Sequence, residues 1–363
     1  MKFDMETIVA QFTFSGDFIH AEPFGHGHIN DTYAVYFKHE FSSPVRYILQ
    51  RINTDIFKNP GRLMENIRLV TEHIAKKVSN PEREVMTIVP TTDGKLYYTD
   101  PNGLCFRAYV FVDNSTSFQS IENPLYFYKS GQAFGRFQQQ LSDYSGPALF
   151  ETIPDFHNTK ARFQAFLRAV EADSFGRAAS VLPEIEFIKK READASLLTD
   201  LLTAGELPLR ITHNDTKLNN ILIDNQTGEA VCVIDLDTVM PGLSLYDFGD
   251  SIRFGASTAA EDEKDLSKVS MSLSLFESFA KGFLEEAKNA LTPKEIELLP
   301  FGSKIMTLEC GMRFLTDYLS GDVYFKTHYE GQNLDRCRTQ FTLVADMEEK
   351  MPQMTQIIAD IVG

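Results

Sequence analysis

Residues 213–224 read HNDTKLNNILID, and residues 230–237 read AVCVIDLD. Each contains a short apolar run rich in β-branched residues, which favours two strands joined by a turn. Asp215 lies in the loop before the first strand, Asn220 follows five residues later, and Asp235 comes at the end of the second run. Two short strands flanking this loop would bring the three side chains together at one edge. The stretch therefore predicts a polar site built on a small β structure.

The spacing of these polar residues suits phosphoryl transfer. That reaction needs a carboxylate that orients or deprotonates the attacking hydroxyl, and hard oxygen ligands for Mg²⁺ on the β- and γ-phosphates. The pattern H-x-D-x-x-x-x-N over 213–220, followed by Asp235, supplies these groups in the order that kinase-like folds use. The competing interpretation is that these residues merely form turns and end a strand. This interpretation accounts well for any one of Asp215, Asn220 and Asp235, but it accounts poorly for all three occurring together.

Two further residues of this loop have open roles. His213 either holds the loop in place by hydrogen bonding or is an ordinary buried histidine of the core. Lys217 lies between Asp215 and Asn220. It either neutralises charge on the transferring phosphoryl group or is an ordinary surface lysine.

A glycine-rich segment, GHGHIND at 25–31, lies between two strand-like segments near the start of the chain. Backbone N–H groups around Gly25 and Gly27 could bind phosphates, although the same pattern describes a plain hairpin turn. The following strand, YILQRI at 47–52, has Gln50-Arg51 where a kinase keeps its phosphate-binding lysine. Arg51 is a candidate replacement because its guanidinium binds phosphate well.

The predicted helix after this strand offers two partners for Arg51. Glu65 and Glu72 are seven residues apart and share a face, so the pattern does not choose between them. Surface ion pairing is the alternative for both.

Three motifs later in the chain carry further acidic and basic residues. Asp247 and Asp250 in YDFGDSIRF are candidates for bracing the catalytic loop. Asp237 would lie on the same side as Asp235 if the strand continued that far, with a metal-binding or a structural role. Arg313 lies in a predicted helix with carboxylates four residues away on either side, so an ion-pair ladder is its simplest interpretation.

The periodicity of the chain changes near residues 112–123. Before this point, alternating apolar residues predict strands and one helical segment is opened by NPG at 59–61; after it, most of the chain is helical. We therefore predict an α+β fold of two lobes. Residues 1–112 form a small antiparallel-sheet lobe with one helix, and residues 113–363 form a larger, mostly helical lobe. The strands are predicted at 18–24, 32–37, 45–52, 85–89, 95–99 and 105–112, and helices at 59–78, 123–141, 159–172, 183–202 and 303–319.

Composition excludes several classes of function. The formal net charge of −16 argues against general binding of nucleic acid or anionic membranes, because both need clustered cations. The four cysteines are far apart and read as reduced, mostly buried thiols. Acidic residues interrupt the N-terminal segment where a signal peptide would be apolar, and no stretch is apolar enough to span a membrane. A cytoplasmic protein is expected, and its oligomeric state is left open.

Several motifs resemble those of the N-acetylhexosamine 1-kinases, a branch of the aminoglycoside phosphotransferase and choline kinase-like group. They are HNDTKLNN, VIDLDTVMPG, YDFGD, GHGHINDTY and YILQRIN. RLMENI, IPDFHNT and GMRFLTDYLSGDVYF look like the hexosamine branch in particular, so the likeness runs along almost the whole chain.

The resemblance implies a two-lobed, protein-kinase-like fold that uses ATP with Mg²⁺. The acceptor would be the anomeric hydroxyl of N-acetylglucosamine or N-acetylgalactosamine. Asp215 matches the catalytic base, and Asn220 and Asp235 match the metal ligands.

Other positions match the family's ligand contacts. Adenine would lie near Arg107–Phe111, with Tyr109 among the nucleotide-binding residues. His28, Arg313 and Tyr324 fall where the family contacts its sugar. The sequence departs from the usual kinase pattern at Gln50-Arg51, where kinases have a lysine. Which residue binds the phosphates is therefore left open.

Two alternative functions are kept. One is a kinase of the same fold that acts on an amino alcohol, an aminoglycoside or another sugar. The other is a pseudokinase that binds nucleotide without catalysis. The second alternative should lack Asp215, Asn220 or Asp235, and all three are present.

Overall fold

The computed structural model describes residues 3–25, 29–38, 44–118 and 123–363. The chain folds into two compact units, each built from separate segments. The first comprises Met1–Thr116, Asp143–Pro154 and Leu222–Met240, and the second comprises Ser117–Ser142, Asp155–Ile221 and Pro241–Gly363. The first unit thus includes chain from beyond residue 112, and the predicted division into functional lobes at 112 stays a prediction.

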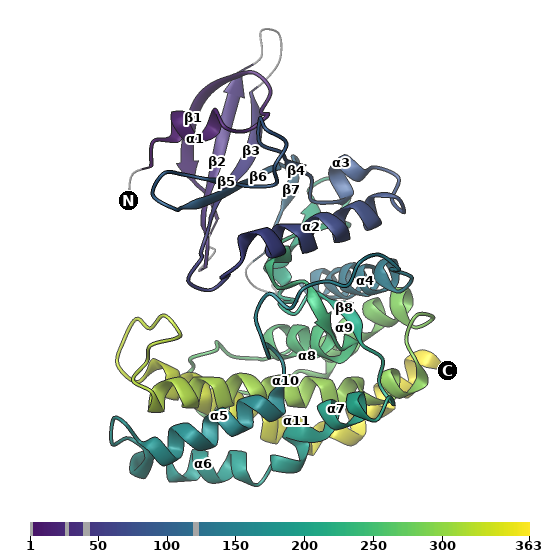
Figure 1. The fold of residues 1–363 in the computed structure, drawn as a ribbon. Coiled ribbons are helices and arrows are strands. Elements are labelled where there is room, and N and C mark those ends of the chain that lie inside the picture. The colour runs from purple at the N-terminus through teal and green to yellow at the C-terminus, as the bar shows by residue number, and fades with distance from the viewer. Residues whose placement is uncertain (1–2, 26–28, 39–43, 119–122) are drawn as a thin grey trace. The chain divides into compact units, whose positions relative to one another are not determined.

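The first unit is organised around an antiparallel sheet in the order β1-β2-β3-β6-β4, with β5 paired to β6 (Figure 1). Its strands are β1 Asp17–Pro23, β2 Asp31–Lys38, β3 Val45–Ile52, β4 Ile88–Val89, β5 Tyr98–Thr99 and β6 Cys105–Val110. The strands predicted at 18–24, 32–37 and 45–52 are confirmed. Those predicted at 85–89 and 95–99 shrink to two residues each because only their ends pair with β6.

The two faces of this sheet bury different side chains. On one face Tyr47, Leu49, Phe106 and Ala108 join an apolar cluster with the short helix α1, Met5–Val9. Neighbouring residues along a strand point to opposite faces, so Gln50 and its register partner, Arg107, belong to the other face.

Helix α2, Pro60–Ala75, and the short helix α3, Pro81–Glu84, complete the connections of this sheet. The Asn59 side chain caps α2 by accepting a hydrogen bond from the Arg62 backbone N–H at 3.0 Å. Proline at the first turn lacks an N–H that would be unsatisfied there, so NPG starts this helix as predicted.

A small three-stranded sheet, in the order β10-β9-β7, carries the chain after the 213–220 loop. Its strands are β7 Ser115–Thr116, β9 Ile221–Asp224 and β10 Ala230–Val233. Strand β10 ends before Asp235, and the 3₁₀ turn η3, Leu236–Thr238, follows at once. Because the strand does not continue to Asp237, the prediction that Asp237 and Asp235 share one side of a strand is wrong.

The second unit is mostly helical, with α10 at its centre packed against α5, α8 and α11 (Figure 1). Its elements are α4 Pro124–Leu141, α5 Thr159–Ala172, η1 Ala178–Val181, α6 Leu182–Lys189, α7 Glu192–Thr203, β8 Arg210–Thr212, η2 Leu218–Asn220, β11 Met240–Gly242, α8 Ser244–Gly255, η4 Leu266–Lys268, α9 Leu273–Ala287, α10 Pro293–Leu319 and α11 Gln332–Val362. The helix predicted over 183–202 is instead two helices, because the chain breaks between Lys189 and Glu192.

Helix α8 lies unusually close to α10 because both carry glycine at the contact. A Cβ on Gly249 would lie 2.3 Å from the Gly302 carbonyl oxygen. Any larger residue at Gly249 would therefore push α8 away from α10. This close approach matters because α8 carries the acidic residues of YDFGDSIRF.

The α+β composition predicted from the sequence is confirmed, with an antiparallel sheet early in the chain and a mostly helical remainder. In the described part of the chain, no helix is both long enough and apolar enough to cross a membrane. Cys105, Cys232 and Cys337 are buried thiols, and Cys310 is half-buried.

Candidate functional site

The 213–220 loop lies between β8 and β9, as predicted, and belongs to the second unit up to its end. Asn214 adopts a left-handed conformation with φ of 65° although it is not glycine. Such strained backbone persists only where neighbouring groups hold it, and it is common in functional loops. The surrounding residues supply the hydrogen bonds that hold this one.

Helix α8 holds the loop through its first carboxylate. The Asp247 side chain accepts hydrogen bonds from the backbone N–H of His213 at 3.0 Å and of Asn214 at 2.8 Å. The Gln138 side chain donates to the same carboxylate at 2.5 Å. Asp247 is fully buried, and burial raises its pKa although these bonds oppose the shift. The prediction that an aspartate of YDFGD braces the loop is confirmed.

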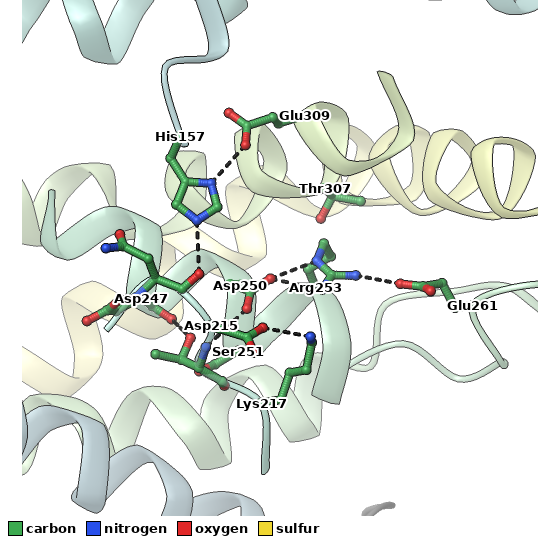
Figure 2. Close-up of polar contacts among 12 residues, drawn as sticks. His157, Asp215, Lys217, Asp247, Asp250, Ser251, Arg253, Glu261, Thr307 and Glu309 are labelled. Carbon is green, nitrogen blue, oxygen red and sulfur yellow. Dashed lines mark hydrogen bonds and ion pairs between the residues drawn. The ribbon is translucent and has the colours of Figure 1, made fainter. Parts of the chain in front are cut away.

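A second carboxylate of α8 holds the next part of the loop. Asp250 accepts from the Thr216 backbone N–H at 3.1 Å and pairs with buried Arg253 at 2.9 Å. Ser251 donates to the Thr216 carbonyl at 2.7 Å. Figure 2 shows Asp215 and Lys217 beside this set of contacts, with Arg253 also reaching Glu261 at 3.0 Å.

His157 holds the loop from the opposite side (Figure 2). Its Nε2 lies 3.0 Å from the Asn214 carbonyl oxygen, and its Nδ1 lies 2.8 Å from a Glu309 oxygen. Burial raises the pKa of Glu309, but the charge and hydrogen bond of His157 and the hydrogen bond of Thr159 leave that pKa below its usual value. Because both partners of the ring are acceptors, an ionised Glu309 requires both ring nitrogens to donate.

The loop places Asp215, Lys217 and Asn220 together. Lys217 Nζ lies 2.6 Å from one Asp215 oxygen, and the Asn220 amide donates to the other at 3.1 Å. Burial would raise the pKa of Asp215, but Lys217, His213 and Asn220 lower it below the usual value. Asp215 is therefore ionised at neutral pH and ready to accept a proton.

The side chains fit a hard cation. The Asn220 amide nitrogen also donates to the Asp215 carbonyl at 2.7 Å, whereas no described residue donates a hydrogen bond to its Oδ1. Amide and carboxylate oxygens are the ligands that Mg²⁺ prefers. The described residues hold no cluster of three or more His, Cys, Asp or Glu arranged for a metal. A cation carried on a nucleotide needs fewer protein ligands because phosphates supply the others.

Arg313 and Tyr324, both predicted to bind sugar, lie together in the second unit. The Arg313 guanidinium lies 3.4 Å from the Tyr324 hydroxyl and 5.4–5.7 Å from the ring centroids of Phe156, Tyr324 and Phe325. We call these four residues the Arg313 cluster. Arg162 lies close enough that repulsion from Arg313, after burial, lowers the Arg162 pKa.

The ion-pair ladder considered for Arg313 is wrong. Glu309 binds His157 and Thr159, while Asp317 accepts the backbone N–H groups of the loop that carries Tyr324. No carboxylate of the described residues pairs with Arg313 within 4.0 Å. The cluster therefore holds a guanidinium beside three aromatic rings without a carboxylate in contact, although the nearby charge of Glu309 still acts on it.

The first unit contains the predicted glycine-rich loop and Asp235. Gly25 has φ of 74°, a conformation that favours glycine, in the connection between β1 and β2. Gly27 and His28 lie outside the described residues. Asp235 is left-handed, with φ of 59°, just before η3. It lies in a different unit from Asp215 and Asn220, so their meeting at one site stays a prediction.

The structure gives Arg51 another role than the one expected. Arg51 pairs with Asp31 at 2.6 Å, on the sheet face that carries Phe106. Glu65 and Glu72 both pair with Arg68 of their own helix, so neither orients Arg51. The expectation that one of them does so is wrong.

Asp237 is a structural link within the first unit. Its two oxygens lie 2.5 Å from an Arg107 nitrogen and 2.7 Å from the Asn30 amide nitrogen. Arg107 and Asp237 are both buried. Tyr109, a predicted nucleotide contact, follows Arg107 on the same sheet face, and burial is the main cause that raises its pKa well above the usual value.

Sequence reasoning missed the supporting residues Gln138 and His157 and the part played by Arg107. Each acts on a segment far away in the chain, so local spacing carries no signal for it. The one usable hint was the presence of Arg107 in an otherwise apolar strand, CFRAYV.

Comparison with known proteins bears on the family and the fold of the chain. A family model described as the phosphotransferase enzyme family matches residues 20–268. The structure is similar to a microcompartment-associated aminopropanol kinase, with a TM-score of 0.65, 18% identity and 96% of each chain covered. It is also similar to an aminoglycoside phosphotransferase from Alicyclobacillus acidocaldarius, with a TM-score of 0.61, 11% identity and 99% of this chain and 98% of that chain covered. A choline kinase from Cryptosporidium parvum gives a TM-score of 0.56 at 14% identity, over 95% of this chain and 93% of that chain.

At these identities the likeness concerns the fold, and it confirms the kinase-like fold predicted from the sequence. The family match rests on the sequence itself and spans well over half of the 363 residues. The chain therefore belongs to the phosphotransferase enzyme family.

Proposed function

We propose that this protein is an ATP-dependent kinase that phosphorylates the anomeric hydroxyl of N-acetylglucosamine or N-acetylgalactosamine. Family membership supports phosphoryl transfer, and the ionised Asp215 beside Lys217 and Asn220 supports a hydroxyl acceptor. The resemblance of the motifs to hexosamine 1-kinases supports the sugar. A cytoplasmic location, where ATP is supplied, is part of the proposal.

The Arg313 cluster is the observation that carries the choice of acceptor. Kinases of amino alcohols and aminoglycosides bind a cation, which an arginine without a contacting carboxylate would repel. An acetamido sugar is neutral, has hydroxyl and carbonyl oxygens for a guanidinium, and presents apolar ring faces for aromatic side chains. The carboxylates near Arg313 are already used by His157 and by the 323–325 loop.

The residues divide the chemical work as follows. Asp215 accepts the proton of the attacking hydroxyl, and a carboxylate with a low pKa suits an anomeric hydroxyl because that group is more acidic than an ordinary alcohol. Lys217 offsets negative charge close to Asp215. Asn220 and Asp235 would hold Mg²⁺, which would supply positive charge to the nucleotide phosphates.

Two other functions are kept as alternatives, and the experiment described below tests them as well. A kinase for an amine is the main alternative, since the structural neighbours include proteins described as aminopropanol and choline kinases. A pseudokinase is the other, and the presence of Asp215, Asn220 and Asp235 argues against it.

The experiment measures ADP formation from ATP and Mg²⁺ with a panel of acceptors. N-Acetylglucosamine and glucosamine form the matched pair, because they share a ring and differ in the acetamido group and the charge. Ethanolamine, choline and an aminoglycoside complete the panel, and Asp215→Asn controls for contaminating kinases. We expect the acetamido sugar to be preferred over glucosamine by about 100-fold or more in kcat/KM. Faster turnover of any amine would contradict the sugar assignment, and no turnover of any acceptor by folded, ATP-binding protein would favour the pseudokinase.

A further inference from the structure

On the sheet face that carries Gln50, no cation stands at the β3 position where a kinase normally has one. In kinases a lysine on this strand contacts the phosphates. Here β3 carries Gln50 on the sheet face that also carries Arg107, whereas Arg51 is on the opposite face and pairs with Asp31. Arg46 shares the Gln50 face but is already paired with Asp113, so the candidate phosphate-binding cation comes from another element.

Arg107 is the buried cation of this face. It lies on β6 in register with Gln50, and only 1% of its surface is exposed. Its Nε donates to Gln50 Oε1 at 3.0 Å, its Nη1 pairs with Asp237 at 2.5 Å, and that Nη1 also lies 3.9 Å from the Met64 sulfur on α2. Gln50 thus occupies the expected position and orients an arginine from the neighbouring strand.

Part of this buried polar group is unsatisfied. No described residue accepts a hydrogen bond from Nη2 of Arg107. The hydroxyl of Tyr109, which is 3% exposed, also has no partner among the described residues. Buried polar groups are normally paired, so the unpartnered Tyr109 hydroxyl indicates a missing hydrogen-bond partner, and Nη2 of Arg107 is a second donor on the same strand face. The Arg107 guanidinium lies 5.4 Å from the Tyr109 ring centroid, so the two groups are neighbours.

The same network reaches the segment that carries Asp235. Asp237 lies in η3, directly after Asp235, and the charges of both aspartates act on Arg107. Asn30, at the end of the glycine-rich connection, donates to Asp237 at 2.7 Å. Arg107 is therefore held where the glycine-rich connection and the proposed metal-binding segment converge, all within the first unit.

We propose that Arg107, with the Tyr109 hydroxyl as a second donor, contacts the phosphates of the bound nucleotide. The assignment rests on the proposed kinase function and names the residue that replaces the usual lysine. Gln50 and Asp237 are positioning residues that fix the guanidinium. A guanidinium suits this position because it keeps donors for phosphate while others bind the protein.

Calorimetric titration of ADP and adenosine tests the assignment without any turnover. Arg107→Gln should raise the Kd for ADP about 10- to 100-fold and leave the Kd for adenosine within about twofold, because adenosine has no phosphate. Tyr109→Phe should weaken ADP binding by a smaller factor. Arg46→Gln is the matched control, since Arg46 is a half-buried arginine of the same β3 face whose guanidinium is already paired with Asp113, and it should change neither constant.

The comparison with Arg51→Gln separates the two arginines. If Arg51→Gln weakens ADP binding and Arg107→Gln does not, the assignment is overturned in favour of the strand position expected from the sequence. Parallel loss of ADP and adenosine in Arg107→Gln would also overturn it, because a purely structural role does not discriminate between the ligands.

Conservative variants decide the question if Arg107→Gln does not fold. Asp237→Asn leaves the arginine in place and removes its counter-charge, so ADP should bind as tightly as to the wild type or more tightly. Arg107→Lys should weaken ADP binding selectively. Unchanged ADP binding in Arg107→Lys, or a joint loss of both ligands, would contradict the assignment. Wild-type protein that binds neither ADP nor adenosine would instead contradict the proposed kinase function.

Discussion

Asp215 is ionised at neutral pH because Lys217, His213 and Asn220 offset the effect of its burial on the pKa. A base of this kind acts by orienting and accepting one proton, and asparagine keeps the shape of the side chain without that capacity. Asp215→Asn should therefore lower kcat by about 10²- to 10⁴-fold. The Kd for ADP, measured by calorimetry on the same preparation, should stay within about threefold. A kcat within tenfold of the wild type would rule out Asp215 as the base.

Arg313 has no carboxylate partner and is surrounded by Phe156, Tyr324 and Phe325. If this cluster binds the acceptor, Arg313→Ala should raise the sugar KM about 10- to 100-fold, as expected for the loss of a charged hydrogen bond. The KM for ATP should change less than about twofold. Steady-state kinetics with each substrate varied in turn give both values, and Arg336→Ala on α11 is a control arginine of the same unit. An equal rise in the two KM values would show that Arg313 does not bind the acceptor.

At the scale of elements, His157 connects the segment before α5 to the 213–220 loop and to α10. It contacts the carbonyl of strained Asn214, next to Asp215. His157→Ala should lower kcat about 10- to 100-fold, because a small displacement of a catalytic group has a large effect on rate. Affinity for ADP should be nearly unchanged, and Glu309→Gln should produce a milder version of the same defect. A variant that loses stability but keeps the wild-type kcat would show that His157 only supports the fold.

Glu295 joins three elements at the start of α10. It completes the capping box with Thr292 and accepts from Arg210 at 2.5 and 2.6 Å and from Ser244 at 2.7 Å. Burial would raise its pKa, but these donors hold it below the usual 4.5. Its contribution to stability is therefore present above about pH 4.5 and is lost as the pH falls further.

Glu295→Gln should reduce the free energy of unfolding by about 2 to 4 kcal/mol near pH 7, because it removes the buried half of this ion pair and leaves half-buried Arg210 without a counter-charge. Urea denaturation gives this value, and the gap between the variant and the wild type should shrink near pH 4. A gap that stays constant with pH, or widens on acidification, would show that the carboxylate charge is not what stabilises this junction.

The sequence predicts an element well when the interactions that define it are between residues close together in the chain. Helix α5 follows from local caps and spacing, and its predicted position is confirmed. Helix α10 ends where predicted but begins earlier, at Pro293. The break between α6 and α7 has no proline or glycine to mark it, and the predicted single helix is wrong. β4 and β5 are shorter than predicted because partner strands, not propensity, decide how much of each segment pairs.

The candidate site shows the same limit. The order of Asp215, Asn220 and Asp235 is a local pattern and could be recognised in the sequence. The contacts that hold them come from Gln138, Asp247 and His157, and a single sequence does not show which distant side chain fills a given position. The role of Arg51 in binding phosphate stays a prediction, although the alternation of β3 turns it to the face opposite Gln50, where it pairs with Asp31.

At the scale of the whole molecule, the surface and the proposed acceptor site have opposite charge. The chain carries a net charge of −16, which would attract amines, whereas Arg313 and Arg162 would repel them locally. Contacts at the acceptor decide specificity, since long-range charge mainly affects encounter rates. Composition alone therefore does not decide between an amine and a neutral sugar as the acceptor.

The most direct measurement is ³¹P NMR of the purified protein with ATP, Mg²⁺ and N-acetylglucosamine or N-acetylgalactosamine. We expect a new phosphomonoester signal that couples to the anomeric proton, appears together with ADP and is absent with Asp215→Asn. A signal coupled to a different sugar proton would contradict transfer to the anomeric hydroxyl. Intact ATP with both sugars, in protein shown to bind ATP, would contradict the hexosamine acceptor altogether.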